Sequence, residues 1–258
     1  MTSPSRSISV FFPAFNDGGT IASMVVLAAR TVRNVTDDFE VIVVDDGSTD
    51  ATALVLEELQ REYGCLRVVT HPKNRGYGAA LRTGFAAASK ELILYTDGDA
   101  QYDPREFPLL LDALRDDVDI VNGYKIDRSD PLHRKIIGRI YHYIVKFLFG
   151  FKLRDVDCDF RLIRRRVFGV IELQSDSGAI CLEFVKCAQD AGYRFAQVPV
   201  HHFNRVYGRS QFFNLPRLWR TFVQVVGLWT MLVIRRDHLP LIAKRKQEME
   251  RLAAQASP

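Results

Sequence analysis

The first hundred residues alternate short apolar runs with longer segments in which apolar residues recur every three or four positions. Short runs rich in Val, Ile, Leu and Phe are typical of buried strands, whereas the longer spacing is typical of helices that bury one face. The predicted strands cover residues 8–12, 40–44, 66–70 and 91–95. The predicted helices lie between them, at residues 20–33, 51–63 and 77–89.

The regular order of strand and helix predicts an α/β fold, in which a mostly parallel, Rossmann-like sheet is flanked by helices on both faces. Ligands of such sheets bind beyond the carboxyl ends of the strands. Three acidic clusters follow predicted strands, and they contain Asp17, Asp46, and the pair Asp97 and Asp99. Gathering carboxylates on one edge costs repulsion unless a cation or hydrogen-bond donors offset it. The pattern therefore predicts a ligand site at this edge.

The second half of the chain has a different pattern. Residues 132–149 (LHRKIIGRIYHYIVKFLF) form a basic amphipathic helix by spacing. Residues 215–234 are apolar, but polar side chains interrupt them, and they fall short of the roughly 20 apolar residues that a bilayer span requires. Either both segments lie at a membrane interface, or they bury their apolar faces on the core or in a dimer. We divide the chain into a globular domain at 1–212 and C-terminal amphipathic helices with a charged tail at 213–258.

Composition and cysteine usage restrict the cellular setting. A chain of 258 residues with 47% hydrophobic content can bury one substantial core. The four cysteines show neither metal-binding spacing nor the density of a secreted scaffold, which favours reduced thiols in the cytoplasm. The polar first seven residues do not resemble a signal peptide. We expect a cytoplasmic protein at the cytoplasmic face of the membrane.

The charge distribution is uneven along the chain. Residues 1–124 carry 11 basic and 19 acidic side chains, a net charge of −8, and residues 125–258 carry 24 basic and 12 acidic side chains, a net charge of +12. The acidic half suits a metal ion that screens a phosphorylated ligand. The basic half, with interleaved aromatic residues, suits an anionic membrane surface better than nucleic acid, for which the sequence offers no other signal.

The triplet Asp97-Gly98-Asp99 carries the most specific chemistry. Two carboxylates separated by one glycine can converge on a single hard divalent cation, since such cations prefer oxygen ligands. That cation can in turn hold a diphosphate. The triplet alone would also fit a solvated turn. Its place after a predicted strand, together with the other two acidic clusters, favours the metal.

Taken in order, these motifs resemble those of the family 2 glycosyltransferases of GT-A fold, in the branch of dolichol-phosphate and polyprenol-phosphate sugar transferases. The resemblance covers roughly residues 6–212. Residues 13–17 (PAFND) resemble the family's nucleotide-contacting Pro-x-Tyr-Asn-Glu, 45–50 (DDGSTD) its nucleotide-holding loop, and 74–80 (NRGYGAA) its glycine-rich turn. The resemblance implies that these residues contact the donor: Pro13, Phe15, Asp17, Val44, Asp46, Asp97, Gly98 and Arg205.

The resemblance also implies a metal ligand set and a phosphate clamp. Asp97, Asp99 and Gln101 match the branch's Asp-x-Asp-x-Gln and are expected to hold Mg²⁺ or Mn²⁺ on the donor diphosphate. Residues 204–210 (NRVYGRS) are similar to the segment that closes over the donor phosphates, in which Arg205 takes the clamping position. Cys158 and Asp159 replace the Ser-Gly of the acceptor motif. This departure leaves the acceptor's identity open and adds a carboxylate near the reacting centre.

The expected activity is a metal-dependent, inverting transfer from a nucleotide sugar of the GDP-mannose or UDP-hexose type to a polyprenyl or dolichyl phosphate. An acceptor phosphate is already ionised at neutral pH and needs no general base. The residues expected to be catalytic are Asp99, Asp159, Arg139 and Arg205. Those expected to bind the acceptor phosphate are Lys125, Arg134 and Arg139.

Two alternatives remain open from the sequence. If the acceptor is a hydroxyl of a glycan, glycolipid or small molecule, a base is required, and the candidates are Asp159, Asp157 and Glu183. In another class of function, the chain would be a non-catalytic nucleotide-sugar-binding subunit of a membrane complex. The intact acidic set argues against that class. A membrane-protein partner and a homo-oligomer are both compatible with the sequence.

Overall fold

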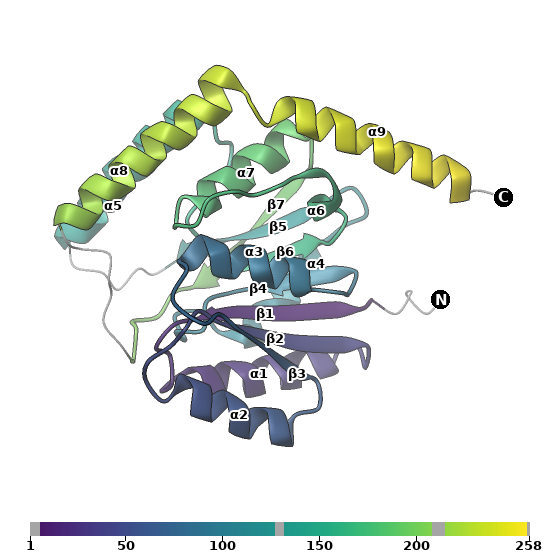
Figure 1. Cartoon of the computed structure of the whole chain (residues 1–258), viewed down its shortest axis with the longest axis vertical. Helices are drawn as coiled ribbons and strands as arrows, with labels where there is room; N and C mark the ends of the chain where they lie inside the picture. The colour runs from purple at the N-terminus through teal and green to yellow at the C-terminus, as the bar shows by residue number, and fades with distance from the viewer. Residues whose placement is uncertain (1–5, 127–131, 208–214, 257–258) are drawn as a thin grey trace.

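The computed structural model describes residues 6–126, 132–207 and 215–256, and these residues form an α/β structure around one seven-stranded sheet (Figure 1). The strands are β1 (Ile8–Ala14), β2 (Phe39–Asp45), β3 (Leu66–Thr70), β4 (Leu92–Tyr95), β5 (Ile120–Ile126), β6 (Arg161–Arg164) and β7 (Phe195–His201). The helices of the first half are α1 (Ile21–Arg33), α2 (Thr52–Glu62), α3 (Tyr77–Ala87), η1 (Pro104–Glu106) and α4 (Phe107–Ala113). Those of the second half are α5 (Leu132–Phe149), α6 (Val167–Val170), α7 (Ile180–Asp190), α8 (Leu215–Trp229), the π-helical turn η2 (Thr230–Arg235) and α9 (Leu239–Ala256).

The predicted α/β class is confirmed, and each of the four predicted strands and three predicted helices is present with its ends shifted by at most two residues. The strand order is β3-β2-β1-β4-β6-β5-β7. All neighbouring strands run parallel except β6, which is antiparallel to both β4 and β5. The carboxyl ends of the six parallel strands and the amino end of β6 therefore share one edge, at the left of Figure 1, here called the ligand edge.

Strand β1 lies at the point where the chain changes direction across the sheet. From β1 the chain moves to β2 and then β3 on one side, and it later places β4 on the other side of β1. The connecting loops diverge at such a switch point and leave a crevice at the carboxyl ends of the two central strands. The loops after β1 and β4 carry Asp17, Asp97 and Asp99, so the acidic clusters flank this point.

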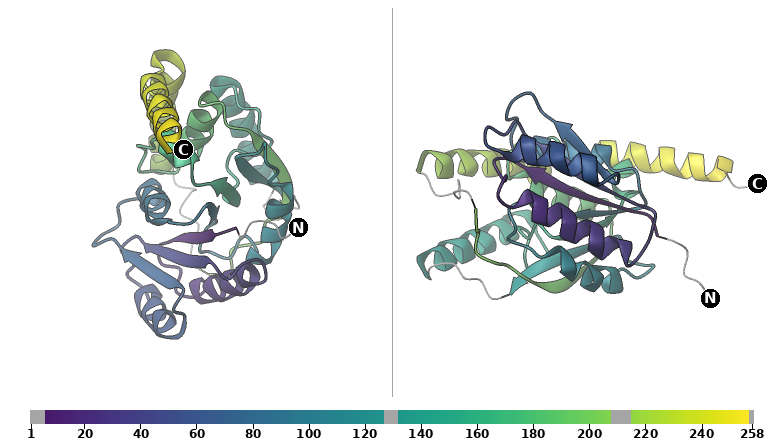
Figure 2. Two further views of the ribbon diagram at one scale, coloured as in Figure 1. Left: turned by 90° about the vertical axis from the view of Figure 1, so that its right-hand side faces the viewer. Right: turned by 90° about the horizontal axis from the view of Figure 1, so that it is seen from below.

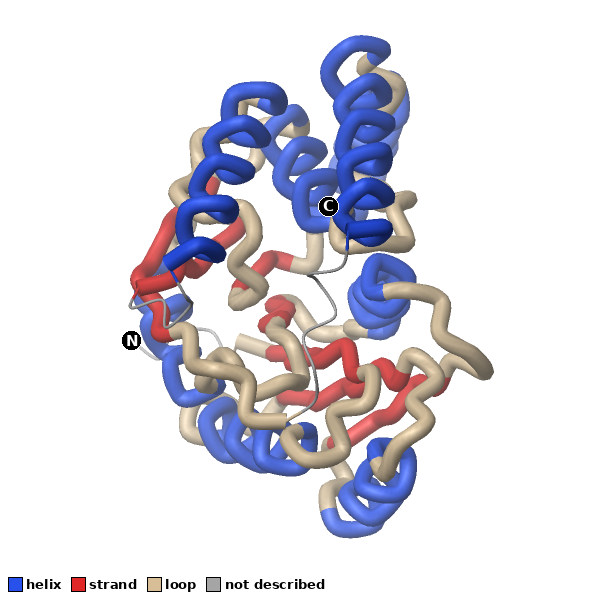
Figure 3. Tube along the Cα trace, turned by 90° about the vertical axis from the view of Figure 1, so that its left-hand side faces the viewer, coloured by secondary structure: helices blue, strands red, loops and turns tan. Residues whose placement is uncertain are grey.

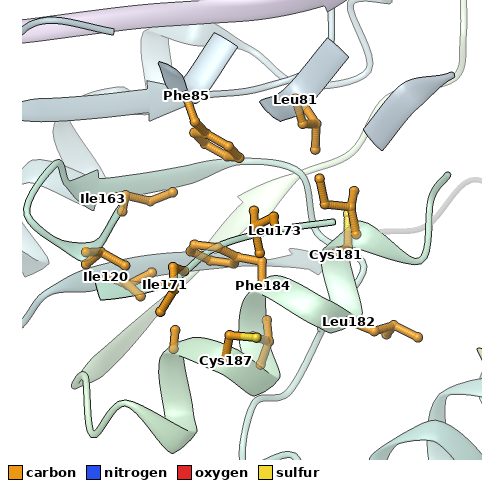
Figure 4. Packing of buried hydrophobic residues seen from close by; sticks show 14 of the residues in the cluster. Leu81, Phe85, Ile120, Ile163, Ile171, Leu173, Cys181, Leu182, Phe184 and Cys187 are labelled. Atoms are coloured by element: carbon orange, nitrogen blue, oxygen red, sulfur yellow. The ribbon is translucent and has the colours of Figure 1, made fainter. Parts of the chain in front are cut away.

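Two hydrophobic cores lie on opposite faces of the sheet, because side chains alternate along each strand. Val10 and Phe12 of β1 pack on the face covered by α1 and α4, whereas Phe11 packs on the face covered by α3 and α7. Figure 3 shows helices on both sides of the strands. Figure 4 shows the second core, in which Phe85 of α3 and Phe184 of α7 point toward each other from opposite sides of the cluster.

The C-terminal helices share this second core. Val225 and Leu228 of α8, Leu232 of η2 and Ile242 of α9 are all buried in it. The Trp229 indole also donates a hydrogen bond to the Leu148 carbonyl of α5, at 2.9 Å. The far end of α9 projects beyond the sheet (Figure 2). The predicted domain boundary at residue 212 lies outside the described residues. None of the helices in the described ranges combines the length and apolarity that crossing a bilayer would need.

Candidate active site

The loop after β1 is tied to the loop after β2 by Asn16. This residue has a positive φ of 58°, a conformation that asparagine tolerates better than most residues. Its side-chain oxygen accepts hydrogen bonds from the backbone N–H groups of Thr49 (2.8 Å) and Asp50 (3.3 Å), and its own N–H donates to the Ser48 hydroxyl (3.0 Å). The two predicted nucleotide loops therefore form one rigid unit.

Asp46 holds the glycine-rich turn in place through hydrogen bonds to its carboxylate. Its carboxylate accepts bonds from the His71 ring (2.6 Å) and from the N–H groups of Arg75 and Gly76 (both 2.9 Å), and it is 3% exposed. Val44 is fully buried in the core. The structure therefore gives both residues internal contacts at the ligand edge, and their predicted contact with the base and ribose stays a prediction.

The glycine-rich turn begins α3 where two backbone segments approach closely. Gly76 has a φ of 99°, and a Cβ there would lie 2.4 Å from the Asp176 carbonyl oxygen. A Cβ at Gly78 would lie 2.3 Å from the Ser175 carbonyl oxygen. Because only glycine fits at these positions, the turn fixes α3, and its first residue Tyr77, against the loop that precedes α7.

The loop after β4 brings the predicted metal ligands to the centre of the ligand edge. Gly98 N–H donates to the Pro13 carbonyl (3.3 Å), and the Thr20 hydroxyl donates to the Gly98 carbonyl (2.9 Å), so this loop is fastened to β1 and to the start of α1. Asp99 is 4% exposed and forms an ion pair with Arg205. Ala100, the next residue, has a φ of 60°, a strained left-handed conformation at which the loop turns.

Residues 202–207, which follow β7, cross over this loop. Gln101 exchanges two hydrogen bonds with Phe203: the Phe203 N–H donates to the Gln101 carbonyl (2.9 Å), and the Gln101 side-chain amide donates to the Phe203 carbonyl (3.1 Å). The Tyr207 ring lies over Gly19, where an added Cβ would come within 2.4 Å of it. The crossing places Arg205 beside the acidic centre through its ion pair with Asp99, and its predicted role as a clamp on the donor phosphates stays a prediction.

The carboxylates at this centre repel one another. Burial raises the pKa of Asp97 well above its ordinary value, and the nearby Asp159 and Asp99 raise it further. Burial also raises the pKa of Asp99, although Arg205 opposes this effect. A second positive charge at the centre would relieve the same repulsion.

Asp17 shares this environment, and its titration predicts a measurable stability change. Burial is the main cause that raises its pKa from 3.8 to about 6. A carboxyl whose pKa is raised on folding stabilises the fold below pH 3.8, and this contribution is lost as the pH rises through about 6. Asp17→Asn is therefore expected to increase the free energy of unfolding by about 3 kcal/mol at pH 8 and to change it little at pH 4.

Thermal melting at the two pH values measures this difference. Asp37→Asn is the control, since Asp37 is exposed and lies away from the acidic centre. Equal free energies of unfolding for wild type and Asp17→Asn at pH 8 would show that the ionised Asp17 carboxylate does not destabilise the fold.

The predicted acceptor side of the ligand edge lies between β5 and the loop before β6. Lys125 lies near the end of β5, and its ammonium group donates a hydrogen bond to the Asp157 carbonyl (2.7 Å). The negative charges of the acidic run at residues 155–159 stabilise the positive charge of Lys125. Arg139 is exposed on α5, and the side chain of Arg134 lies outside the described residues. The three predicted acceptor-phosphate residues therefore come from β5 and α5, of which the structure places Lys125 at the ligand edge.

The three candidates for a general base have different environments. Glu183 is 1% exposed, and its carboxylate accepts the N–H groups of Gln174 (2.9 Å) and Ser175 (2.8 Å), which is a role in holding a loop. Burial raises the pKa of Asp157 to about 6, with Lys125 opposing the shift. Asp159 accepts bonds from the Tyr95 hydroxyl (2.7 Å) and the Cys181 thiol (3.2 Å). Asp159 is thus the candidate that hydrogen bonds link to Asp97, through Tyr95 and Tyr77, and its charge also acts on Asp97.

Several residues at this edge were not identified from the sequence. They are Asn16, His71, Tyr77, Tyr95, Asp155, Arg161, Cys181 and Tyr207. Tyr77 lies inside the glycine-rich turn and Tyr95 two residues before Asp97, so proximity to motifs was the available signal for these two. Arg161 lies two residues after Asp159, at the end of the stretch that resembles the acceptor motif, whereas Cys181 carries no such signal.

The residues present fit a divalent cation whose ligands come partly from elsewhere. Among the described residues, no three His, Cys, Asp or Glu side chains converge as a complete metal cage. Asp97 and Asp99 nevertheless offer hard oxygen donors in a crowded acidic centre, and Mg²⁺ or Mn²⁺ commonly takes its remaining ligands from phosphates and water. The donor set therefore suits a cation that arrives with a diphosphate.

Comparison with known proteins supplies further findings. Residues 9–171 match the family model for glycosyl transferase family 2. The chain is 29% identical over 227 residues to the dodecaprenyl-phosphate galacturonate synthase of Rhizobium johnstonii, a match that covers 87% of this chain and 67% of that protein. It is 25% identical over 240 residues to the undecaprenyl-phosphate 4-deoxy-4-formamido-L-arabinose transferase of Salmonella choleraesuis, which covers 92% and 70% of the two chains.

The fold resembles solved structures as well. The glucosyl-3-phosphoglycerate synthase of Mycobacterium tuberculosis, in a complex with Mn²⁺, UDP-glucose and phosphoglyceric acid, superposes with a TM-score of 0.65 at 22% identity. That match covers 87% of this chain and 79% of the other. At this identity the likeness supports the shared fold.

Proposed function

Since the chain belongs to glycosyl transferase family 2 and is a glycosyltransferase, we propose that it moves a sugar from a nucleotide-sugar donor to a polyprenyl phosphate, with inversion at the sugar's C1. The observation that carries this proposal is the convergence of Asp17, Asp97, Asp99 and Arg205 with Lys125 and Asp159 on one edge of the sheet. The acceptor class is supported by the two curated relatives, whose names specify polyprenyl phosphates.

The proposed reaction exchanges one phosphate ester at C1 for another. An oxygen of the acceptor phosphate forms a bond to C1 from the face opposite the leaving group. The bond between C1 and the donor's diphosphate oxygen breaks, and its electron pair leaves with the nucleoside diphosphate. Because the attacking oxygen is already an anion, no proton has to be removed.

The protein's contribution is then position and charge. Arg205, pre-placed over the acidic centre through its ion pair with Asp99, can turn to a phosphate oxygen of the departing diphosphate. The Lys125 ammonium donates one hydrogen bond to the Asp157 carbonyl and keeps its other protons for the acceptor phosphate. Arg139, exposed on α5, would supply a second positive charge. A divalent cation held by Asp97 and Asp99, with Gln101 beside them, would neutralise charge on the leaving group when bound.

Transfer to a defined acceptor tests the proposal. Purified protein is incubated with UDP- or GDP-sugars, Mn²⁺ or Mg²⁺, and undecaprenyl phosphate in vesicles, and labelled sugar in the lipid fraction is measured. We expect lipid labelling that requires both the phosphate and the cation. Labelling of a neutral hydroxyl acceptor alone would overturn the polyprenyl-phosphate assignment and would make Asp159 the candidate base. Nucleotide-sugar binding without any transfer would support the non-catalytic alternative.

Membrane association is the part of the proposal that the helices α5 and α8 support. Figure 1 shows both helices extending toward the side of the ligand edge. Large apolar side chains are exposed on them: Ile140, Tyr143, Ile144 and Phe147 on α5, and Trp219, Phe222, Val223 and Val226 on α8. Basic residues such as Arg139 and Arg220 accompany these side chains, which suits an anionic lipid surface.

Replacing Phe147 with serine tests this surface. The side chain is 87% exposed, so its loss removes little from the folded core, whereas a buried Phe contributes about 1.5–3 kcal/mol in an apolar environment. We expect roughly 10-fold weaker binding to phosphatidylglycerol vesicles in a sedimentation assay. Leu54→Ser, which changes an exposed leucine of α2 outside α5 and α8, is the matched control. Equal loss in both variants would contradict a specific role of α5.

A further inference from the structure

A continuous chain of hydrogen-bonded side chains joins the donor side of the ligand edge to its acceptor side. The Tyr77 hydroxyl donates to the Asp97 carboxylate at 2.7 Å. The Tyr77 and Tyr95 hydroxyls are in direct hydrogen-bond contact, and the Tyr95 hydroxyl donates to the Asp159 carboxylate at 2.7 Å. The four groups come from three segments, namely the start of α3, the end of β4 with the loop after it, and the loop before β6, so their contact depends on the tertiary fold.

The sheet explains why these segments meet. Tyr95 ends β4, and its neighbour across the sheet is Arg161, the first residue of antiparallel β6. Asp159, two residues before Arg161, therefore emerges at the same edge as Asp97, two residues after Tyr95. Tyr77 reaches the same edge from the start of α3, which the glycine-rich turn holds in place.

Both rings pack against the second core, Tyr77 as a partly buried residue and Tyr95 as a buried one. The Tyr95 side chain is fully buried and stacks on Phe11, with ring centroids 5.1 Å apart. The Arg161 guanidinium lies 6.0 Å from the Tyr95 ring centroid on the edge of β6. Burial raises the pKa of each tyrosine well above 10, so both hydroxyls keep their protons and remain donors.

The two hydroxyl protons of Tyr77 and Tyr95 are shared among three hydrogen-bond contacts, and this links Asp97 at one end of the chain to Asp159 at the other. Each hydroxyl has one proton, so Tyr77 donates either to Asp97 or to Tyr95, and Tyr95 donates either to Tyr77 or to Asp159. Two hydroxyl protons serve three contacts. If a ligand of Asp97 releases Tyr77, the Tyr77 hydroxyl can donate to Tyr95, which keeps the Tyr95 proton on Asp159 and strengthens that bond. If Tyr95 instead donates to Tyr77, the Tyr77 proton lies on Asp97, and Asp159 loses this donor. The way Asp97 is engaged therefore affects how firmly Asp159 is held.

We propose that Tyr77 and Tyr95 are positioning residues that tie the orientation of Asp159 on the acceptor side to the engagement of Asp97 on the donor side. The pair acts through the two carboxylates and does not itself touch the reacting atoms. The inference rests on the proposed function, because it deepens the account of the same site.

A double-mutant cycle tests the coupling. Tyr77→Phe, Tyr95→Phe and the double variant are compared by kcat/KM for sugar transfer. Hydrogen bonds to charged groups are the strong ones, and each single change is expected to lower kcat/KM about 10-fold. If the tyrosines act as a unit, the double variant also loses about 10-fold rather than about 100-fold. Losses that multiply would overturn the proposal, and so would singles that retain full activity.

A binding measurement provides a readout that a purely structural role would not move. The Tyr95 hydroxyl bonds Tyr77 and Asp159 rather than Asp97. Its replacement is nevertheless expected to weaken the binding of a nucleoside diphosphate with Mn²⁺ about 3-fold or more in calorimetry, because Tyr77 then has no hydroxyl to donate to when the cation engages Asp97. Tyr193→Phe is the control, since this hydroxyl donates to the Arg166 carbonyl at 3.4 Å and lies before the amino end of β7, away from the ligand edge. An unchanged dissociation constant in Tyr95→Phe would overturn the coupling.

The two proposals fail in different ways. If the wild-type protein transfers no sugar to any acceptor, the proposed function fails, and the calorimetric comparison still tests the coupling. If the wild type is active and the cycle is multiplicative, the coupling alone fails. Should Tyr95→Phe not fold, the cycle is repeated with Tyr77→Phe and Asp159→Asn, which probe both ends of the chain and leave Tyr95 intact. A non-multiplicative loss is again expected, and a multiplicative one overturns the coupling.

Discussion

Asp99→Asn is expected to lower sugar transfer by roughly 10²–10³-fold with little change in melting temperature. The Asp99 carboxylate is 4% exposed, faces Arg205 and is one of the two hard donors expected to hold the cation. Losing one well-placed electrostatic group at a reacting centre commonly costs this factor. Asparagine keeps the shape, can still accept the Gln101 N–H bond, and removes the charge that repels its acidic neighbours, so the fold is retained.

Initial rates at saturating donor and a titration of Mn²⁺ measure this effect. Asp112→Asn, an exposed carboxylate on α4, is the matched control and should keep its activity. A higher Mn²⁺ requirement with a rescued rate would locate the loss in cation binding. Full activity of Asp99→Asn at low Mn²⁺ would remove Asp99 from the predicted metal ligands.

Arg161→Met is expected to lower the free energy of unfolding by about 3 kcal/mol. Arg161 is 1% exposed and donates to the Asn122 side-chain oxygen (2.8 Å) and to the Val156 carbonyl (2.6 Å). Methionine fills part of the space but leaves both buried oxygens without this donor. The guanidinium also lies 5.4 Å from the Phe184 ring centroid, so a packing contact with α7 is lost too.

Thermal or urea-induced unfolding measures the change, which corresponds to a fall of about 10 °C in melting temperature for a chain of this size. Arg30→Met, at an exposed position near the end of α1, controls for the loss of charge and should change stability by less than about 0.5 kcal/mol. Equal melting temperatures for Arg161→Met and wild type would mean that the loop at residues 155–159 is held by other contacts.

The first half of the fold could be predicted from the sequence because its signals are local. Apolar runs and helical spacing gave β1 to β4 and α1 to α3, and the rule for parallel strands placed Asp17, Asp97 and Asp99 on one edge. The helical pattern of α5 was equally clear. In each case the residues that define the element are neighbours in the sequence.

The second half of the site depends on pairings that leave no local pattern. Strand β6 has four residues, two of them arginine, and its apolar content is too low to mark it as a buried strand. Its antiparallel direction decides that Asp159 faces the same edge as Asp97, and this direction follows from long-range packing. For the same reason the contacts of Tyr77, Tyr95 and Cys181 with the carboxylates could not be read from the chain. Asp46 and Glu183 carried a functional pattern, yet the structure shows their carboxylates bound to backbone N–H groups.

The reversed strand β6 also lets two separate parts of the chain meet at one edge. The loops predicted to bind the donor follow β1, β2 and β4, whereas residues 155–159 reach the same edge just before β6. Substitutions at Asp157 and Asp159 are therefore expected to change the predicted acceptor side while the hydrogen-bond register of the central strands stays as it is. Directed evolution of these two positions is a route to new acceptors on an unchanged nucleotide-sugar scaffold.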